Sequence, residues 1–198
     1  MPKNKLSPMT GKLIVFSAPS GAGKTTLVKA LLMQKPNLVF SVSAASRDKR
    51  AHETDKKDYY FISVKEFKNR IEQGEFLEWQ EVYPNQYYGT LLSEIDRIWA
   101  TGNHVIFDVD VLGGLNIKKH FGSRALTIFI KPPSMVHLEQ RLQNRGTESE
   151  ESLQKRLSKA EFELSFEEQF DVVVVNDDIQ MAQQKIVEAI EKFLNENK

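Results

Sequence analysis

The chain has 198 residues, 40% hydrophobic and 27% charged, which suits a single domain, or one domain with a lid, and not a disordered chain. Its 27 Lys and Arg balance 27 Asp and Glu and it has no cysteine, so a basic field for nucleic acid, disulfides, thiolate metal sites and cysteine nucleophiles are not expected. No apolar run approaches the roughly 18 residues of a membrane span and no signal-peptide core follows Met1, so we expect a cytoplasmic protein without nucleic-acid or membrane partners, of undetermined oligomeric state.

The first β-rich run, residues 12–17, leads through Ala-Pro-Ser-Gly-Ala-Gly-Lys-Thr, residues 18–25, into a stretch of helical period that ends before Pro36. This loop follows the Walker A pattern except that Ala18 replaces the first Gly, which is harmless if φ is negative there. Its backbone amides would surround a phosphate at the positive end of the helix. In that pattern Lys24 bridges the β- and γ-phosphates and the Thr25 hydroxyl holds Mg²⁺. Chance produces such a loop in about one chain in a hundred, so we expect a nucleoside triphosphate rather than a glycine turn that binds nothing.

Arginines and tyrosines follow the second apolar run, residues 37–42. They are Arg47, Arg50, Tyr59, Tyr87 and Tyr88. Arginine forks bind phosphate oxygens in pairs, and tyrosine hydroxyls can complete the shell. Scattered surface residues are the more ordinary interpretation of these side chains, so they only suggest an acceptor phosphate.

Residues 44–90 contain one clear helix, around 64–73, among short aromatic and charged stretches, which indicates a small β-rich subdomain. Within them Glu78 lies in the apolar run Phe76-Leu77-Glu78-Trp79, where an unpaired charge is costly. One carboxylate can accept both N1–H and the 2-amino group of guanine, whereas adenine has a bare acceptor at N1. The position therefore favours a guanine site, and a strand Glu that points into solvent is the alternative.

Apolar runs recur at residues 104–109, 125–130 and 171–175, each followed by a stretch of helical period. Strands that are apolar on both faces and alternate with helices are typical of a parallel sheet covered on both sides, which binds ligands beyond its carboxyl edge. Residues 141–168 differ, because an arginine-containing run precedes a highly charged helix that begins near Ser149. This pattern fits either a lid or a plain solvated helix.

Further short segments match one known family in the same order: Phe40-Ser41-Val42-Ser43, Lys57-Asp58-Tyr59, Tyr87-Tyr88-Gly89-Thr90, Phe107-Asp108-Val109-Asp110, Arg145-Gly146-Thr147-Glu148, Lys155-Arg156-Leu157 and Val175-Asn176-Asp177-Asp178. With the phosphate loop, the arginines and Glu78, they make the chain resemble the guanylate kinases, P-loop nucleoside monophosphate kinases that transfer the γ-phosphoryl group of ATP to GMP. The resemblance runs from about residue 12 to the C-terminus.

The resemblance implies a role for each matching residue. The ATP-binding residues would be Ala18, Pro19, Ser20, Gly21, Ala22, Gly23, Lys24, Thr25, Thr26 and, as an adenine contact, Asn176. The GMP phosphate ligands would be Arg47, Arg50, Tyr59 and Tyr88, and the guanine readers would be Ser43, Glu78, Thr90 and Asp110. Catalysis would depend on Lys24, Arg47 and the lid arginines Arg141, Arg145 and Arg156. Thr25 would bind Mg²⁺ directly, and Asp108 would order it through water.

The implied fold is α/β, a P-loop NTPase-type parallel sheet flanked by helices, with a small mixed β GMP-binding subdomain and a helical lid. One domain, 1–198, would contain a core of residues 11–43, 91–137 and 169–198, a subdomain at about 44–90 and a lid at about 138–168. The chain departs from the family pattern at Ala18, His52, Lys56 and Leu112, and by an extra residue in 82–86.

In the expected reaction, an oxygen of the GMP phosphate attacks the γ-phosphorus of ATP in line. This nucleophile is already anionic, so no general base is required and no histidine is expected to be catalytic. Two alternatives stay open: a kinase of the same fold that acts on another monophosphate or a sugar phosphate, and a non-catalytic guanylate-kinase-like module that binds peptides. Glu78 with Ser43 and Thr90 favours guanine, and the intact Gly23-Lys24-Thr25 favours an enzyme.

Overall fold

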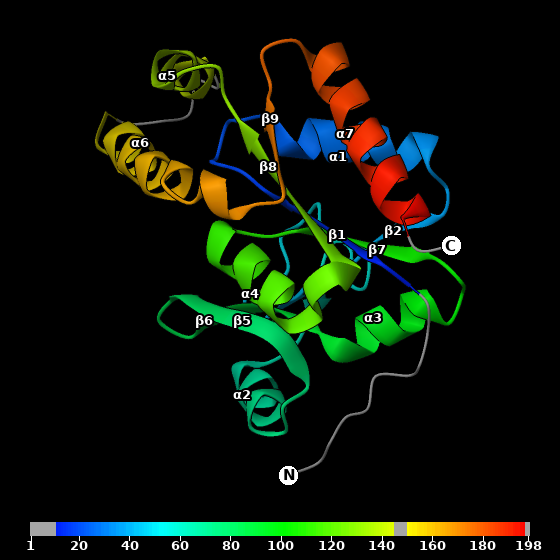
Figure 1. The fold of residues 1–198 in the computed structure, drawn as a ribbon. Helices are drawn as coiled ribbons and strands as arrows, with labels where there is room; N and C mark the ends of the chain where they lie inside the picture. The colour runs from blue at the N-terminus through cyan, green and yellow to red at the C-terminus, as the bar shows by residue number, and fades with distance from the viewer. Residues whose placement is uncertain (1–10, 145–149, 197–198) are drawn as a thin grey trace. The chain divides into compact units, whose positions relative to one another are not determined.

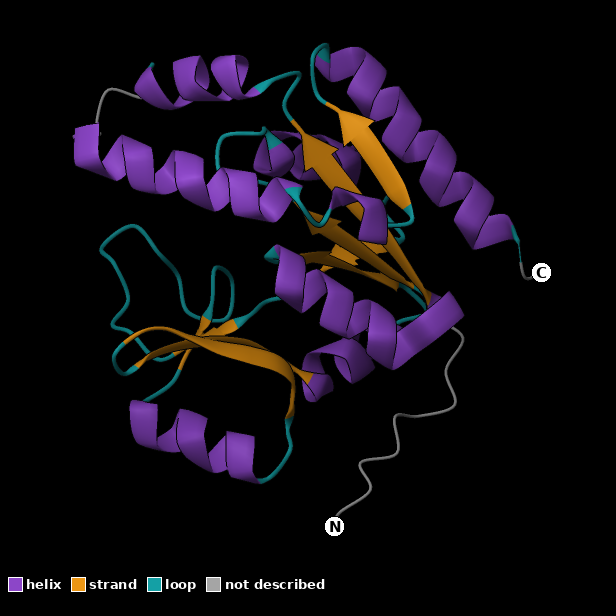
Figure 2. Ribbon diagram, turned by 60° about the vertical axis from the view of Figure 1, so that its left-hand side comes forward, coloured by secondary structure: helices purple, strands orange, loops and turns teal. Residues whose placement is uncertain are grey.

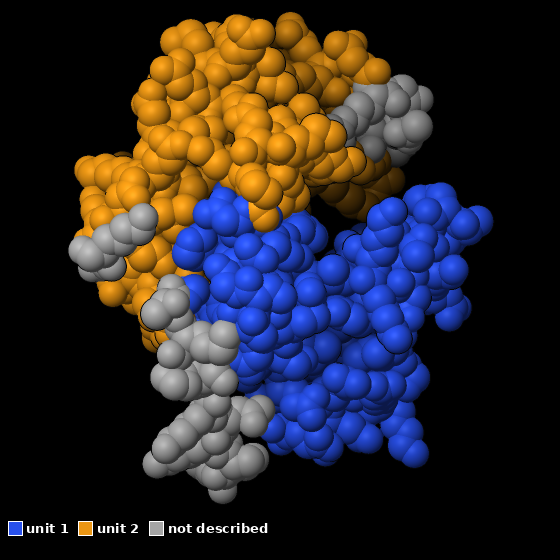
Figure 3. Space-filling view, turned by 90° about the vertical axis from the view of Figure 1, so that its right-hand side faces the viewer, with its two compact units in different colours: residues 1–11, 37–105 blue, residues 12–36, 106–198 orange. Residues whose placement is uncertain are grey.

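The computed structural model describes residues 11–144 and 150–196. The chain divides into two compact units, coloured separately in Figure 3. Unit 1 comprises residues 37–105 and the N-terminal residues up to Gly11, and unit 2 comprises residues 12–36 and 106–198. The narrower bounds expected for the subdomain and the lid stay predictions.

Five strands form a sheet with the order β2-β7-β1-β8-β9 (Figure 1). Its strands are β1 (Leu13–Ser17), β2 (Leu38–Phe40), β7 (His104–Asp108), β8 (Ala125–Lys131) and β9 (Val172–Val175). The pairs β1–β8 and β8–β9 are parallel, and every residue of β1 is buried. A strand that is apolar on both faces has this position because helices cover both sides of the sheet. The parallel sheet predicted from the sequence is therefore confirmed.

The helices of unit 2 are α1 (Lys24–Gln34), α4 (Val111–Phe121), α5 (Met135–Gln143), α6 (Glu150–Leu164) and α7 (Ile179–Asn195). Figure 2 shows α4 and α7 on opposite sides of the sheet, and α7 also contacts α1. Short side chains cap three of these helices by accepting from amides of the first turn: Asp110 at α4, Ser134 at α5 and Asp178 at α7. Within the described ranges, no helix is both long enough and apolar enough to cross a membrane.

Helix α6 is fixed along its length although its sequence is highly charged. Leu153 and Ala160 pack against Leu138 and Leu142 of α5, and Leu164 packs beside Phe129 of the central sheet. These small and apolar residues recur on one face of α6. The charged residues on its other face therefore face solvent or the neighbouring cavity. The charged helix expected from the sequence thus packs against other elements of unit 2 and does not project alone into solvent.

Unit 1 contains a four-stranded mixed sheet with the order β4-β3-β6-β5. The elements are β3 (Ala44–Ala45), β4 (Tyr60–Phe61), α2 (Val64–Glu72), β5 (Phe76–Tyr83), β6 (Gln86–Leu91) and α3 (Leu92–Trp99). Strands β3 and β4 are parallel, whereas β3–β6 and β5–β6 are antiparallel. Phe67 of α2 stacks on Phe76 at 4.3 Å between ring centroids and also packs against Tyr87, which places Tyr87 in the core. The predicted small β-rich region with one helix is confirmed.

Candidate functional site

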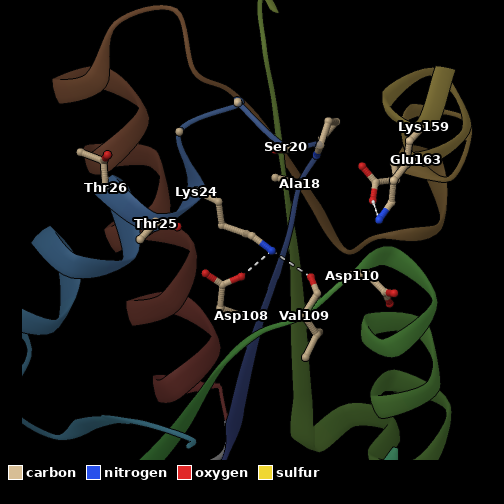
Figure 4. A pocket seen from close by; sticks show the side chains of 13 residues that line it. Ala18, Ser20, Lys24, Thr25, Thr26, Asp108, Val109, Asp110, Lys159 and Glu163 are labelled. Atoms are coloured by element: carbon tan, nitrogen blue, oxygen red, sulfur yellow. Dashed lines mark hydrogen bonds and ion pairs between the residues drawn. The ribbon is translucent and has the colours of Figure 1, made fainter. Parts of the chain in front are cut away.

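A polar cavity of about 390 Å³ lies in unit 2, where β1 leads into α1 (Figure 4). It is lined by every predicted ATP-binding residue from 18 to 26 except Ala22. The end of β7 and the start of α4 contribute Asp108, Val109 and Asp110, and α6 contributes Lys159 and Glu163. The cavity therefore lies beyond the carboxyl ends of parallel strands, as expected for a sheet of this class.

Two glycines give the loop its curvature. Gly21 and Gly23 have φ angles of 96° and 93°, which side chains with a Cβ rarely adopt. Gly23 is also the residue before α1, and a Cβ there would lie 2.2 Å from Asn176 Nδ2. Among the described non-glycine residues, positive φ angles occur at Lys56 and Asn85 but not at Ala18. The Ala18 methyl group therefore imposes no backbone strain, so the missing first glycine leaves the loop intact.

Lys24 is held at the floor of the cavity. Its Nζ lies 2.5 Å from Asp108 Oδ1 and donates to the Val109 carbonyl oxygen at 2.9 Å. Asp108 is the last residue of β7 and Val109 is the next residue, so the end of this strand fixes the position of the ammonium group. A cation on a glycine-rich loop at a helix N-terminus is the arrangement that binds phosphate.

The same cavity contains the oxygen donors that Mg²⁺ prefers. The Thr25 hydroxyl and the Asp108 carboxylate both line it. In the part of the chain that the structure describes, no group of three or more His, Asp or Glu side chains forms a metal cage. Mg²⁺ is commonly held by one or two protein oxygens together with substrate phosphates, so these residues fit the ion.

Asn176 contacts the loop directly, and Arg141 contacts Asn176. Asn176 is 6% exposed, and its Nδ2 donates to the Ala22 carbonyl oxygen at 2.7 Å. Arg141 Nη2 in turn donates to the Asn176 carbonyl oxygen at 2.9 Å. The adenine contact expected of Asn176 and the lid role expected of Arg141 stay predictions. Arg156 lies half-buried on α6 outside the cavity lining, and Arg145 lies outside the described residues.

In unit 1, Arg47 is the centre of an aromatic and acidic cluster. Its Nη1 and Nη2 both donate to the Glu53 carboxylate at 2.6 Å, and its Nε donates to Tyr88 Oη at 3.0 Å. The guanidinium also lies over the rings of Tyr59 and Phe61, 5.2 and 5.4 Å from their centroids. Three of the four predicted GMP phosphate ligands, Arg47, Tyr59 and Tyr88, are therefore neighbours.

The ion pair fixes the charge of both partners. The hydrogen bond from Arg47 holds the pKa of the Glu53 carboxyl at about 2, against the effect of burial. The same hydrogen bond raises the pKa of Arg47. Arg50, the fourth predicted phosphate ligand, donates its backbone N–H to Glu53 Oε2 at 2.9 Å, while its side chain is exposed. Glu53 thus organises both ends of the Arg47–Arg50 segment.

Lys56 shows what one departure from the family pattern costs. Its φ angle is 63°, in the left-handed region that favours glycine, so a residue with a side chain costs about 1 kcal/mol there. Its backbone N–H donates to the Tyr59 carbonyl oxygen at 2.8 Å, which closes the turn before Tyr59. The turn is therefore kept despite the substitution.

Of the four predicted guanine readers, Glu78 and Thr90 contact each other. They face each other across β5 and β6, and buried Thr90 Oγ1 donates to Glu78 Oε1 at 2.7 Å. Glu78 is half-buried, so its carboxylate does not simply point into solvent. Ser43 precedes β3 in the same unit, and its carbonyl oxygen accepts from Tyr60 N. Asp110 instead lines the unit 2 cavity, where its carboxylate accepts from Gly113 N at the start of α4.

The sequence reasoning missed four residues of these clusters: Glu53, Phe61, Lys159 and Glu163. Glu53 carried a signal, a carboxylate three residues after Arg50 in a segment with more basic than acidic residues. Lys159 and Glu163 form an ion pair one helical turn apart, at 3.8 Å, but this spacing is ordinary on charged helices. Burial is the largest influence on Glu163 and raises the pKa of its carboxyl.

Three comparisons relate the chain to known proteins. A family model described as guanylate kinase matches residues 10–193. The chain is 51% identical to a guanylate kinase of Bacteroides thetaiotaomicron, over 94% of this chain and 92% of that protein. It is 50% identical to one of Porphyromonas gingivalis, over 92% and 98%. The crystal structure of guanylate kinase from Anaplasma phagocytophilum matches with a TM-score of 0.72 and 29% identity, over 94% of this chain and 88% of that one.

Proposed function

Because the chain belongs to the guanylate kinase family, we infer that it transfers the γ-phosphoryl group of ATP to GMP and releases ADP and GDP. The observation that carries this inference is the phosphate cavity of unit 2, in which the glycine-rich loop and the Lys24 ammonium group are both in place. A scaffold module that only binds peptides has no need for this arrangement.

In unit 2, the loop amides and Lys24 would bind the triphosphate, with Ala18 to Thr26 around it and Asn176 beside the adenine. Arg141, Arg145 and Arg156 would neutralise charge on the phosphates from the lid, about residues 138–168. Thr25 would hold Mg²⁺ directly and Asp108 would order it through water, and the ion when bound neutralises charge on the β- and γ-phosphates. Because phosphoryl transfer needs little covalent help from the protein, positioning and charge would supply most of the rate.

In unit 1, residues of about 44–90 would bind GMP. Arg47, Arg50, Tyr59 and Tyr88 would bind its phosphate, supported by the contacts that already gather three of them. Glu78 would accept from the guanine edge, with Thr90 and Ser43 as further contacts. The hydrogen bond from Thr90 supports this role, since it orients the carboxylate. The guanine contact expected of Asp110, a residue of unit 2, stays a prediction.

One experiment separates the proposal from its alternatives. Purified protein is supplied with ATP and Mg²⁺ and, in turn, GMP, AMP, CMP, UMP and a sugar phosphate, and ADP formation is followed. We expect strong preference for GMP. Preferred turnover of another acceptor would identify a different kinase of this fold, and failure to bind ATP in calorimetry would favour the peptide-binding module. The cytoplasmic location expected from the sequence stays a prediction that cell fractionation would test.

A further inference from the structure

Two side chains of the phosphate cavity have no role in the proposed function. Lys159 and Glu163 enter its lining from α6, and Figure 4 shows Lys159 turned toward Glu163. The two form an ion pair, with 3.8 Å between Lys159 Nζ and Glu163 Oε1. Glu163 is only 5% exposed, whereas the Lys159 side chain is 67% exposed, so the carboxylate is fixed and the ammonium group is free to turn.

The backbone that carries Lys159 is fixed relative to the loop. Ala160, the next residue, is buried in the cluster that joins α6 to Leu138 and Leu142 of α5. Those same two leucines touch the loop, because a Cβ added to Gly21 would lie 3.0 Å from a methyl group of each. Loop, α5 and α6 are thus packed together, and Lys159 is presented to the cavity by a rigid helix.

The described lining of the cavity contains fewer basic than acidic side chains. Among its described lining residues the cations are Lys24 and Lys159, and the anions are Asp108, Asp110 and Glu163. Lys24 is already matched by Asp108 and the Val109 carbonyl oxygen. A triphosphate carries several negative charges into this space, and an ammonium group on a flexible four-carbon stem can leave a 3.8 Å pair to meet them.

We propose that Lys159 is a further ligand of the ATP phosphates, kept beside the cavity by Glu163 until the nucleotide binds. This inference rests on the proposed function in that it takes the bound anion to be ATP. Lys159 is three residues after Arg156 on the same helix, so α6 would offer two cations to the phosphates, one of which already lines the cavity.

The test compares two lysines of one helix. Lys159→Gln removes the proposed ligand, Lys159→Arg keeps its charge, and Lys155→Gln is the matched control. Lys155 is 75% exposed, pairs with Glu151 at 2.7 Å and lies outside the cavity lining. ATP binding is measured by calorimetry without GMP, alongside steady-state KM values and thermal unfolding. All three substitutions are at exposed positions, so the unfolding temperatures should change little.

We expect Lys159→Gln to raise the Kd and KM for ATP about fivefold to twentyfold, the loss of one charge-assisted contact, with the KM for GMP unchanged. Lys159→Arg should stay within about twofold of the parent chain, and Lys155→Gln should equal it. The inference is overturned if Lys159→Gln binds ATP as the parent does, or if Lys155→Gln weakens ATP equally. Failure of the parent chain to use GMP would instead contradict the proposed function, and the ATP Kd values would still decide the role of Lys159.

Discussion

At the scale of single residues, the proposed function depends most on Lys24. Its side chain is 16% exposed, and its ammonium group is fixed by Asp108 and the Val109 carbonyl oxygen. We expect Lys24→Met, which keeps the stem and removes the charge, to lower kcat about 100- to 1000-fold. Circular dichroism and thermal unfolding should match the parent chain. A variant that turns over GMP at a near-normal rate would remove Lys24 from the mechanism.

Glu78 tests the base-reading role in the same way. Glu78→Gln should raise the KM for GMP about 10- to 100-fold. The amide oxygen can still accept from one guanine donor, but the amide NH₂ group would face the second donor, which would lose its acceptor. Glu81→Gln, at an exposed position on the same strand, is the control and should leave the KM for GMP unchanged. Equal KM values for GMP in the parent chain and Glu78→Gln would contradict guanine recognition by this carboxylate.

At the scale of elements, a buried carboxylate of α3 holds together two segments of unit 1. Glu94 is 2% exposed and accepts from Val42 N at 3.1 Å, from Tyr60 Oη at 2.7 Å and from both Nε and Nη2 of Arg97. Burial acts to raise its pKa, but these hydrogen bonds outweigh burial and keep the pKa below its ordinary value. Val42 and Tyr60 adjoin Ser43 and Tyr59, two of the predicted GMP contacts.

We therefore expect Glu94→Gln to raise the KM for GMP about threefold to tenfold without changing the KM for ATP, since the amide offers one acceptor where two are used. Steady-state kinetics with each substrate varied in turn provides the measurement. Tyr60→Phe, which deletes one of the donors and keeps the carboxylate, should have a smaller effect. A general loss of stability with an unchanged ratio of the two KM values would show that Glu94 is merely structural.

Most elements could be predicted because their patterns are local. Helix α2 was expected at 64–73 and is observed at Val64–Glu72, since Ser63 caps it and Phe67 is its buried residue. The strand indicated by the second apolar run, residues 37–42, is longer than the observed strand β2, which spans Leu38–Phe40. Its remainder leaves the strand because Val42 N pairs with the Glu94 side chain instead of a strand neighbour. That partner is 52 residues away in sequence and no local pattern encodes it.

At the scale of the whole molecule, Asp171 joins distant parts of unit 2. Its Oδ2 accepts from the N–H and hydroxyl of fully buried Thr127 and from Lys118 Nζ, each at 2.8 Å. Burial would raise its pKa, but the hydrogen bonds from Lys118 and Thr127 prevail and lower it. We expect Asp171→Ala to lower the free energy of unfolding by about 1 to 3 kcal/mol at neutral pH, because Thr127 loses its acceptor.

The pH dependence of this loss follows from the sign of the shift. A carboxyl whose pKa is lowered in the folded state stabilises the fold above its unfolded pKa, about 3.9, and loses that contribution as the pH falls through the folded value. Denaturant unfolding at a series of pH values should therefore show the difference between parent and variant at its full size at pH 7 and diminishing below about pH 4. A difference that stays constant across this range would indicate packing rather than charge.

The sequence by itself determined the alternation of strands and helices, the phosphate loop and the Arg47 and Glu78 segments, because each depends on residue types within one turn or one strand. Only the tertiary structure decided that Asn176 donates to Ala22, 154 residues away, that Glu53 pairs with Arg47, and that Lys159 and Glu163 line the phosphate cavity. Such contacts require the chain to be folded, since each partner alone is an ordinary polar residue. These residues act together only because folding brings them close in space, and their spacing along the chain does not encode that closeness.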